Sequence, residues 1–347
     1  MEYISTAIMG QGYNRMVNAS DYLNKRYSTR NLSDIEFENI LPDLAEEISK
    51  TSFYVSYSDD VLNKDYAQLC KWKSNENFIN STSRLGMKLC EHFFPNFYDI
   101  ETNTGNSFRG LWNKDNLIKI LRWNRKSHST PYLSELKRGI YFNCGLPKST
   151  MYRPQMMKLA CMKYNAETVL DPCAGWGGRM LGAVSAGCKY YAFEPNTTTY
   201  DNLQKLINFL GIQNRVQIIC DDARNMNNYN LPNVDLVLTS PPYFDLEVYT
   251  HEDTQSITNC DNYDNWCETF LKPIIEKSLA HLMAKGVSCW NVGKVGNRDM
   301  FKDVIKYHNL NNYTVVETLS VYSSKRQVNQ SVQKNAKSSD DTMIFRK

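Results

Sequence analysis

The second half of this sequence alternates regularly between strand-like and helix-like patterns. Short apolar runs rich in β-branched and aromatic residues are separated by longer segments that carry an apolar stripe at helical spacing. The strand patterns lie at residues 168–171, 190–194, 216–220, 234–238 and 287–292, and the helix patterns lie at 152–164, from about 177, and at 200–210, 266–284 and 300–307. Repeated strand–helix units predict a parallel sheet with helices on both faces.

The end of the chain departs from this alternation. Two strand patterns, at 313–322 and 342–345, bracket a polar loop and predict a hairpin. The hairpin should add an antiparallel edge strand to the sheet. We therefore expect an α/β fold with a mostly parallel, doubly wound sheet and a C-terminal antiparallel hairpin. The helix at 266–284 should be interrupted at Pro273.

The first part of the chain is predicted to be mainly helical. Apolar residues at positions 40, 41, 44 and 48 fall on one helical face, and those at 117, 118, 120 and 121 fall on another. The Gly-Leu-Pro sequence at 145–147 is a plausible break. Because 347 residues suffice for two domains, we expect a helical domain at 1–149 and an α/β domain at 150–347.

Composition excludes several classes of protein. The chain is 42% apolar and 22% charged, which is ordinary for a soluble globular protein. It has no run of eighteen apolar residues, and its start lacks a basic region followed by an apolar one, so we expect neither a membrane span nor a secretory signal. Ten cysteines without C-x-x-C spacing indicate reduced thiols, not a disulfide framework or a metal site. The expected location is the cytoplasm.

Positive charge is concentrated between residues 109 and 163. This stretch has twelve Lys and Arg residues against two acids, Asp115 and Glu135. Such a run is commonly a solvated face. Here it is interleaved with aromatic residues, namely Trp112, Trp123, Tyr132, Tyr141 and Phe142. That mixture favours a phosphate-binding surface with stacking side chains, in which we expect Arg122, Arg125 and Lys126 to contact phosphates, helped by Lys325, Arg326, Lys334 and Lys337.

A glycine-rich turn follows the first strand of the α/β part. Asp171 ends the strand, and Gly175, Gly177 and Gly178 would allow the backbone to approach a ligand that a Cβ would exclude. Ligands of open parallel sheets bind at the carboxyl ends of the strands. The turn alone is also compatible with the start of a helix in another doubly wound protein, although less so.

Acids also end the next two strands. Glu194 ends the second strand, where a carboxylate can accept hydrogen bonds from both hydroxyls of a ribose. Asp221 and Asp222 end the third strand. A single acid in such a place is often a helix cap. Three successive strand ends with acids favour a ligand site.

The fourth strand ends in Ser240, Pro241, Pro242 and Tyr243. The Ser240 hydroxyl and the Pro241 carbonyl are hydrogen-bond acceptors, and the two prolines fix their direction. Tyr243 offers a face for stacking. In isolation, this sequence would be read as a proline-rich turn.

Taken together, in this order and spacing, the glycine turn and residues 240–243 resemble the S-adenosylmethionine-dependent methyltransferases that modify exocyclic amines of DNA bases. The resemblance covers about 150–347 and includes residues 152–155 and the Tyr263 to Trp266 spacing. It implies a Rossmann-like class I methyltransferase fold and S-adenosylmethionine as cofactor. The cofactor-binding residues that it implies are Asp171 (beside the ammonium group), Cys173, Gly175, Gly177, Glu194 (at the ribose) and Asp222 (at the adenine amine, chosen over Asp221).

The resemblance also implies a reaction. Ser240, Pro241, Pro242 and Tyr243 would be catalytic, holding the amine of a flipped-out base of duplex DNA in line with the methyl group. Phe244 and Tyr249 would bind the substrate, and the loop at 245–262 would close over it. The Ser-Pro-Pro-Tyr form leans toward cytosine N4 over adenine N6. The helical residues 1–149 would recognise the target, with Arg122, Arg125 and Lys126 on the DNA backbone.

Two other functions remain open. An RNA methyltransferase could use the same residues 240–243, and a non-catalytic nucleic-acid-binding protein could have kept the fold. Intact Asp171, Glu194 and Ser240 favour an enzyme, because a binding protein does not need all of them. Trp176 and Arg179 extend the glycine turn without an assigned role, although Arg179 could pair with a phosphate or cap its helix.

Overall fold

The chain was analysed as a computed structural model, which describes residues 32–74, 78–80, 83–127, 132–146, 149–295, 298–322, 327–328, 331–332 and 341–347. It divides into two compact units: unit 1 comprises Met1–Tyr57 and Pro95–Thr150, and unit 2 comprises Ser58–Phe94 and Met151–Lys347. The predicted boundary at 149/150 falls next to the one after Thr150. However, Ser58–Phe94, which we had placed in the helical domain, groups with the α/β unit.

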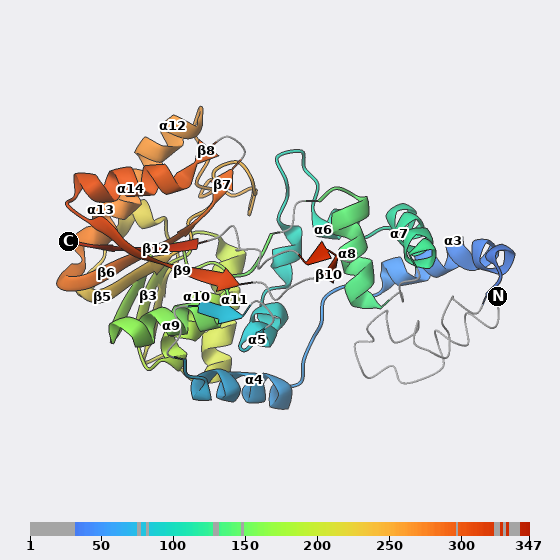
Figure 1. Cartoon of the computed structure of the whole chain (residues 1–347), viewed down its shortest axis with the longest axis horizontal. Helices are drawn as coiled ribbons and strands as arrows, with labels where there is room; N and C mark the ends of the chain where they lie inside the picture. Colours follow the sequence, from blue (N-terminus) through green and yellow to red (C-terminus); the bar gives the residue numbers. More distant parts are fainter. Residues whose placement is uncertain are drawn as a thin grey trace. The chain divides into compact units, whose positions relative to one another are not determined.

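Unit 2 is built around an eight-stranded sheet (Figure 1). The strand order is β1-β9-β12-β6-β5-β2-β3-β4. Only β12 among these strands runs antiparallel to its neighbours. The strands are β1 (Phe78–Asn80), β2 (Thr168–Asp171), β3 (Lys189–Phe193), β4 (Val216–Ile219), β5 (Val234–Thr239), β6 (Leu282–Val292), β9 (Thr314–Tyr322) and β12 (Asp341–Arg346). The predicted α/β fold class is confirmed.

The C-terminal hairpin differs from the prediction in one respect. β9 and β12 are antiparallel partners, as expected, but β12 lies inside the sheet between β6 and β9. The edge is formed by β1, which pairs in parallel with β9. A three-residue strand is too short to show an alternating pattern, so β1 could not be predicted from the sequence.

Helices cover both faces of the sheet (Figure 1). On one face, α13 and α14 belong to an apolar cluster that includes Leu170, Val237, Ile274 and Val304. On the other face lie α9, α10 and α11. The helices of unit 2 are α4 (Asp59–Lys71), α5 (Met87–Phe93), α9 (Pro154–Tyr164), α10 (Gly178–Ser185), α11 (Thr197–Leu210), α12 (Tyr263–Trp266), α13 (Lys272–Ala280) and α14 (Met300–Leu310), with short helical turns η3 (Ala223–Asn228) and η4 (Cys267–Leu271). The interruption predicted near Pro273 is the π-helical turn η4 between α12 and α13.

Two glycines let α9 approach α10 closely. A Cβ on Gly178 would lie 2.0 Å from the carbonyl oxygen of Tyr152, and a Cβ on Gly182 would lie 2.2 Å from that of Pro154. We had assigned Gly178 to a ligand, but its open side faces the backbone that enters α9. The four-residue spacing of the two glycines serves helix packing.

A buried lysine ties α4 to α9. The Lys158 ammonium donates to the carbonyl oxygens of Leu69 and Cys70, at 2.7 Å each, where α4 ends. Burial lowers the pKa of Lys158, and the two carbonyl groups partly compensate for the water that it loses. This residue was counted in the basic stretch, but it serves the packing of unit 2.

Unit 1 is helical, as predicted. Its elements are α3 (Asp34–Lys50), η2 (Pro95–Asp99), α6 (Phe108–Leu111), α7 (Lys114–Lys126) and α8 (Leu133–Asn143). The predicted apolar faces of α3 and α7 meet in one core, which contains Leu41, Ile48, Leu117 and Ile120. No described helix is long and apolar enough to cross a membrane, and no group of three His, Cys, Asp or Glu side chains in the described ranges could hold a metal ion.

We expect Gly182→Val to destabilise the protein, because its Cβ would also meet the Met157 Cβ at 2.5 Å. Overpacking of this kind costs about 1–3 kcal/mol. Urea unfolding followed by circular dichroism measures the loss. Gly211→Asn is the matched control, because a Cβ at Gly211 has no neighbour within 4 Å and asparagine tolerates its left-handed φ of 63°. Equal stability of the two variants would show that α9 and α10 can separate at no cost.

Candidate active site

Four strand ends meet at one edge of the sheet. β2 lies between β3 and β5, and β4 follows β3, with all four strands parallel. Their carboxyl ends therefore bring together Asp171, Glu194, Asp222 and Ser240. Each of these predicted residues comes from a different strand end, as the sequence indicated.

Asp171 is fully buried and its carboxylate is saturated with hydrogen bonds. Oδ1 accepts from the backbone N–H of Cys173 at 3.1 Å and from the Thr239 hydroxyl at 2.7 Å. Oδ2 accepts from Arg179 Nε and from the Tyr190 hydroxyl, both at 2.6 Å. A carboxylate has about four lone-pair positions, and all are used here. The predicted contact of Asp171 with a ligand's ammonium group does not fit this arrangement.

Arg179 is the buried partner of Asp171. Its guanidinium also donates to the Cys173 carbonyl and lies 5.3 Å from the centre of the Tyr152 ring. Burial alone would lower the pKa of Arg179, but the neighbouring Asp171 carboxylate more than offsets burial and raises it. Arg179 therefore remains charged, and it holds the turn between β2 and α10 in place. Neither a phosphate contact nor a helix cap is its role here.

The glycines of this turn have different roles. Gly175 and Gly177 have positive φ angles of 59° and 73°. A Cβ on Gly177 would lie 2.9 Å from the Phe94 ring, so packing also requires this glycine. A Cβ on Gly175 would meet its first neighbours, Arg179 and the Cys173 carbonyl, at 3.6 and 3.8 Å, so packing does not require this glycine and its place in the turn is not filled by other residues. The Cys173 side chain packs against the core of unit 2, and burial raises the pKa of its thiol.

Glu194 has the properties expected of a ligand-binding acid. Oε2 accepts from the Gly175 N–H at 2.8 Å, and Oε1 accepts from the Asn196 N–H at 3.1 Å. Each oxygen keeps a second acceptor position. Glu194 is only 7% exposed, and burial raises its pKa to about 7. Two adjacent hydroxyl groups could donate to the free positions.

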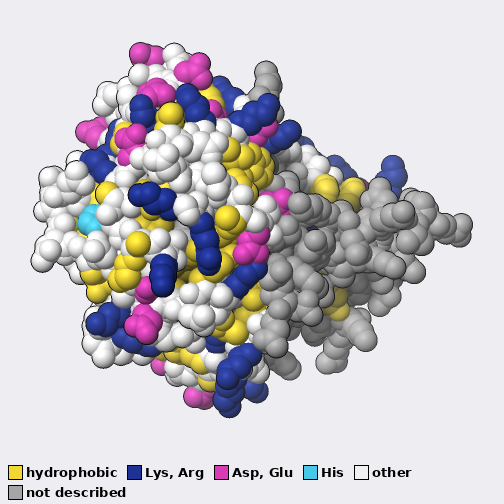
Figure 2. All heavy atoms as spheres, turned by 60° about the vertical axis from the view of Figure 1, so that its left-hand side comes forward, with side chains coloured by type: hydrophobic (Ala, Val, Ile, Leu, Met, Phe, Trp, Pro, Cys, Tyr) yellow, Lys and Arg dark blue, Asp and Glu magenta, His cyan; other side chains and the backbone are white. Residues whose placement is uncertain are grey.

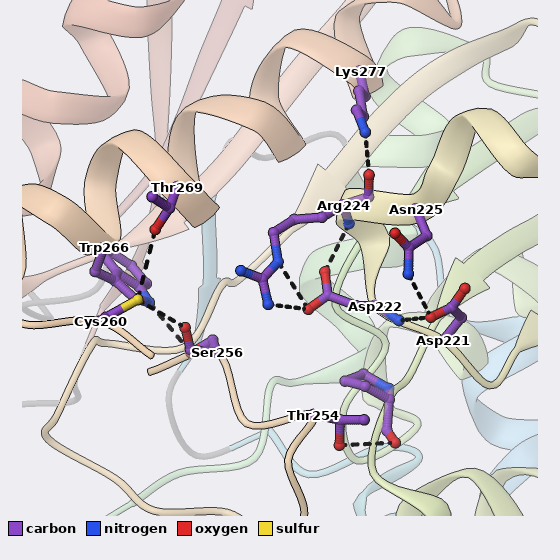
Figure 3. Close-up of polar contacts among 11 residues, drawn as sticks. Asp221, Asp222, Arg224, Asn225, Thr254, Ser256, Cys260, Trp266, Thr269 and Lys277 are labelled. Atoms are coloured by element: carbon purple, nitrogen blue, oxygen red, sulfur yellow. Dashed lines mark hydrogen bonds and ion pairs between the residues drawn. The ribbon is translucent and has the colours of Figure 1, made fainter. Parts of the chain in front are cut away.

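The two acids after β4 also cap the following turn (Figure 3). Asp221 accepts from Asn225 Nδ2 at 2.9 Å and from the Tyr229 hydroxyl at 2.7 Å. Asp222 accepts from the Arg224 backbone N–H at 2.7 Å and, with Oδ2, from its Nε and Nη2. Figure 3 shows that the Asp222–Arg224 pair extends toward the segment that carries Ser256, whereas Asp221 faces η3. The role of Asp222 at a cofactor stays a prediction.

Residues 240–243 begin where β5 ends. The last residue of β5, Thr239, donates its hydroxyl to Asp171, so the ends of β5 and β2 are joined. Ser240 is half-buried, and its hydroxyl forms no hydrogen bond within the described part of the chain. Pro241 is buried, and Tyr243 packs partly against the core of unit 2. The Ser240 hydroxyl is thus held by rigid neighbours but remains available.

Phe244 does not present its ring to a substrate. It is 7% exposed and packs edge-to-face on Tyr263 and Trp266, with ring centres 5.7 and 5.8 Å apart. The Arg298 guanidinium lies 4.6 Å from the Phe244 ring and donates to Asp245 at 2.6 Å. Phe244 also has a φ of 52°, which is a strained value for this residue type. We had predicted substrate binding, but its burial indicates that Phe244 anchors the turn after residue 243.

The loop at 245–262 is attached to the start of α11. Glu252 accepts from the backbone N–H and the hydroxyl of Thr197, and the Thr254 hydroxyl donates to the Pro195 carbonyl at 3.4 Å. Tyr249, in the same loop, has its ring centre 6.2 Å from that of Trp176 in the glycine turn. The loop therefore lies next to both Glu194 and the glycine turn, where the sequence predicted a cover for the site.

Most of the predicted phosphate-binding side chains have protein partners. Arg122 donates to Glu38 of α3 at 2.7 Å, and Arg125 donates to Asp34 and to the Leu32 carbonyl, also at 2.7 Å. Arg109, Lys114 and Lys163 pair with Asp99, Glu46 and Glu317. Most of these acids lie outside the stretch in the sequence, and in this arrangement they engage the Arg122 and Arg125 side chains that we expected on phosphates. Lys126 is exposed, and Lys325, Arg326, Lys334 and Lys337 lie outside the described residues.

The strand order, with antiparallel β12 between parallel β6 and β9, defines a Rossmann-like class I methyltransferase fold. A family model described as "Conserved hypothetical protein 95" matches residues 147–292, fewer than half of the chain. No curated protein matches the sequence.

Solved structures with a similar fold share little sequence with this chain. Precorrin-6y C5,15-methyltransferase from Geobacter metallireducens is 14% identical, with a TM-score of 0.40 over 57% of this chain and 92% of that one. A putative RNA methyltransferase from Pyrococcus horikoshii is 15% identical, with a TM-score of 0.37 over 56% and 83%. An SAM-dependent O-methyltransferase from Thermotoga maritima is 12% identical, with a TM-score of 0.38 over 58% and 68%. A fold by itself does not identify a substrate.

We expect Asp171→Ala to unfold the protein more readily, because it leaves the Arg179 guanidinium buried and unpaired. Breaking a buried ion pair in this way costs about 3–5 kcal/mol. Loss of ligand binding in this variant would therefore report on folding as well as on the site. The double variant Asp171→Leu/Arg179→Met should recover part of the loss in urea unfolding. If the double variant were less stable than Asp171→Ala, the hydrogen bonds from Tyr190 and Thr239 would dominate over the ion pair.

Proposed function

We propose that this protein transfers a methyl group from S-adenosylmethionine to the exocyclic amine of a base in a nucleic acid. The observation that carries the proposal is the position of Ser240: its available hydroxyl follows β5, whose end is joined to Asp171 through Thr239. It therefore lies at the same edge as the open Gly175 turn and Glu194. Methyl transfer requires the residues that would hold the cofactor, Gly175 and Glu194, to lie next to Ser240, which would hold the base.

The residues fit the cofactor with one exception. Glu194 has two free acceptor positions for the ribose hydroxyls, and Gly175 leaves the turn open for the methionine part. Asp222 keeps an acceptor position on Oδ1 for the adenine amine. Asp171 is the exception, because its carboxylate accepts hydrogen bonds from Cys173 and Arg179 of the glycine turn and has no acceptor position left for a ligand. The cofactor would supply an electrophilic methyl group on a positively charged sulfur.

Ser240 and Pro241 would orient the amine. The lone pair of an exocyclic amine is delocalised into the base, so the nitrogen must become tetrahedral to attack. Acceptors aimed at its N–H bonds, here the Ser240 Oγ and the Pro241 carbonyl, favour that geometry. The bound cofactor would supply the methyl group, with its sulfur as the leaving group, while Ser240 Oγ and the Pro241 carbonyl hold the amine. The surplus proton of the methylated amine would pass to solvent. Tyr243 would stack on the base. No covalent enzyme intermediate is needed.

The proposed substrate is a nucleic acid, without a choice between DNA and RNA. The sequence favoured cytosine N4 in duplex DNA, partly because of Arg122 and Arg125, which are paired with acids. Since these two arginines no longer favour duplex DNA, RNA is as good a candidate substrate as DNA. RNA should be assayed first, because structures of this fold include a putative RNA methyltransferase. The face of the molecule in Figure 2 has basic and acidic side chains interspersed among its described residues. A non-catalytic protein has no need of an available Ser240.

Ser240→Ala should slow methyl transfer about 100-fold with little change in cofactor affinity, because the lost acceptor acts in the transition state. The assay follows tritiated methyl groups from S-adenosylmethionine into unmodified RNA transcripts and methyl-free DNA, and nucleoside analysis identifies the base. Ser185→Ala, a hydroxyl loss at the end of α10 away from the strand ends, is the control and should retain full turnover. Undiminished transfer by Ser240→Ala would contradict the assigned role, and no transfer to either polymer would contradict the proposed function.

The raised pKa of Glu194 leads us to expect that cofactor affinity rises with pH. Ribose hydroxyls donate to the ionised carboxylate, and the pKa of free Glu194 is about 7, so binding releases a proton below that pH. Affinity should increase between about pH 6 and pH 8 and then level off. Calorimetry in buffers of different ionisation enthalpy measures both the affinity and the proton. Glu194→Gln should bind more weakly and lose the dependence on pH.

The raised pKa of Glu194 also makes the free energy of unfolding depend on pH in the absence of cofactor. Because the pKa of Glu194 is raised above its unfolded value, the folded state binds the proton more tightly. The contribution of Glu194 to the free energy of unfolding is present at low pH and is lost as the pH rises through about 7. Glu194→Gln should remove this contribution to the pH dependence. An unchanged pH dependence of affinity in Glu194→Gln would contradict the placement of the ribose.

A further inference from the structure

The structure separates the aromatic residues of the basic stretch into two groups. Trp112 is buried, and Tyr141 packs against the core of unit 1. Tyr132 and Phe142 are instead exposed by 40% and 67%, and Trp123 is partly exposed. Phe142 lies on α8 and Trp123 lies on α7, and these two helices pack together (Figure 1). An exposed phenylalanine beside a second accessible ring is a candidate contact surface.

An arginine lies between the two rings. The Arg138 guanidinium carbon is 5.9 Å from the centre of the Trp123 ring and 5.2 Å from that of the Phe142 ring. Its side chain is accessible to solvent, and its ion pair with Glu135 uses only Nη1, at 3.3 Å. The remaining donors of Arg138 can reach a ligand that contacts either ring.

Two lysines flank Trp123 on α7. Lys119 lies four residues before Trp123 and Lys126 lies three residues after it, so both are on the same side of the helix. Both are exposed, and neither forms an ion pair with an acid of the described ranges. Arg122 and Arg125, in contrast, are held by α3. Lys119, which donates only to the Asn116 side chain at 3.5 Å, and Lys126 are therefore the cations of this helix without an acidic partner in the described ranges.

We propose that these five residues, the α7–α8 surface, bind unpaired bases of a nucleic acid strand; the surface consists of Lys119, Trp123, Lys126, Arg138 and Phe142. The two rings stack on bases, and the three cations neutralise phosphates. Bases inside a duplex are stacked on each other and cannot reach the rings, so the surface selects single strands, loops or ends. This inference rests on the proposed function, whose substrate class it narrows.

The test measures binding apart from methyl transfer. The full chain, without cofactor, is titrated into fluorescein-labelled 15-mers of mixed sequence, as RNA, as single-stranded DNA and as duplex DNA, and fluorescence anisotropy is followed. Both single strands should bind more tightly than the duplex. Trp123→Ala and Phe142→Ala should each weaken single-strand binding about 5- to 100-fold, the range for loss of one base–aromatic stack. Circular dichroism checks that each variant is folded.

The cations give an independent readout. Lys119→Ala/Lys126→Ala should weaken binding and reduce the slope of log affinity against log salt by about 0.7 for each lost phosphate contact on a single strand. Arg122→Ala is the matched control from the same helix, because its guanidinium is paired with Glu38, and it should bind like the parent. Ile35→Ala, which removes an exposed apolar side chain from α3, is the second control.

The outcomes separate this inference from the proposed function. Ser240→Ala should bind oligonucleotides like the parent, so binding that depends on Trp123 and Phe142 supports the inference even if no methyl transfer is found. Parent-like binding by both ring variants would overturn it. Equal binding of duplex and single strands would overturn the selection for unpaired bases. Methyl transfer to nucleic acid without any single-strand binding would also overturn the inference. A protein would then be the candidate ligand of the α7–α8 surface.

Discussion

The buried pair of Asp171 and Arg179 is the interaction on which the rest of the site depends. The carboxylate joins the end of β2 to the end of β5 through Thr239, to β3 through Tyr190, and to the start of α10 through Arg179. A buried ion pair is costly unless its hydrogen bonds are satisfied, and here every acceptor position of the carboxylate is used. The glycine turn and residues 240–243 consequently have fixed positions before any ligand arrives, and a site that is ordered in advance loses less entropy on binding.

The sequence predicted the sheet well because buried parallel strands leave a strong signal. The apolar runs at 168–171 and 234–238 appear as β2 and β5, and the acids that follow the strands reach one edge, as the rule for parallel sheets requires. The position of Glu194 at the carboxyl end of β3 could be predicted, because Glu194 directly follows the strand in the sequence. The saturation of Asp171 could not be predicted, since its partners Tyr190 and Thr239 lie far away in the sequence and tyrosine and threonine are ordinary strand residues.

Charge was the least predictable property. The stretch from 109 to 163 has a large excess of Lys and Arg in the sequence, but Asp34, Glu38 and Glu317 come from segments that fold against it. A local count cannot include partners that are brought in by tertiary structure. Phe244 was misassigned for a related reason: nothing in its neighbours along the chain shows that Tyr263 and Trp266 enclose its ring. Trp123, Tyr132 and Phe142 are the aromatic residues of the stretch whose exposure agrees with the interpretation from sequence.

The discontinuous composition of unit 2 has a practical consequence. A fragment that begins at residue 150, where the sequence places its clearest break, would contain all the strand ends of the site. It would nevertheless lack β1, so that the outer edge of β9 would present unpaired N–H and C=O groups to other molecules. It would also lack α4, whose last carbonyl groups accept from the buried Lys158 ammonium. Such a fragment would be prone to aggregation, and it would also lack the buried Phe94 ring beside Gly177, so the smallest piece that preserves the α/β unit must start before α4.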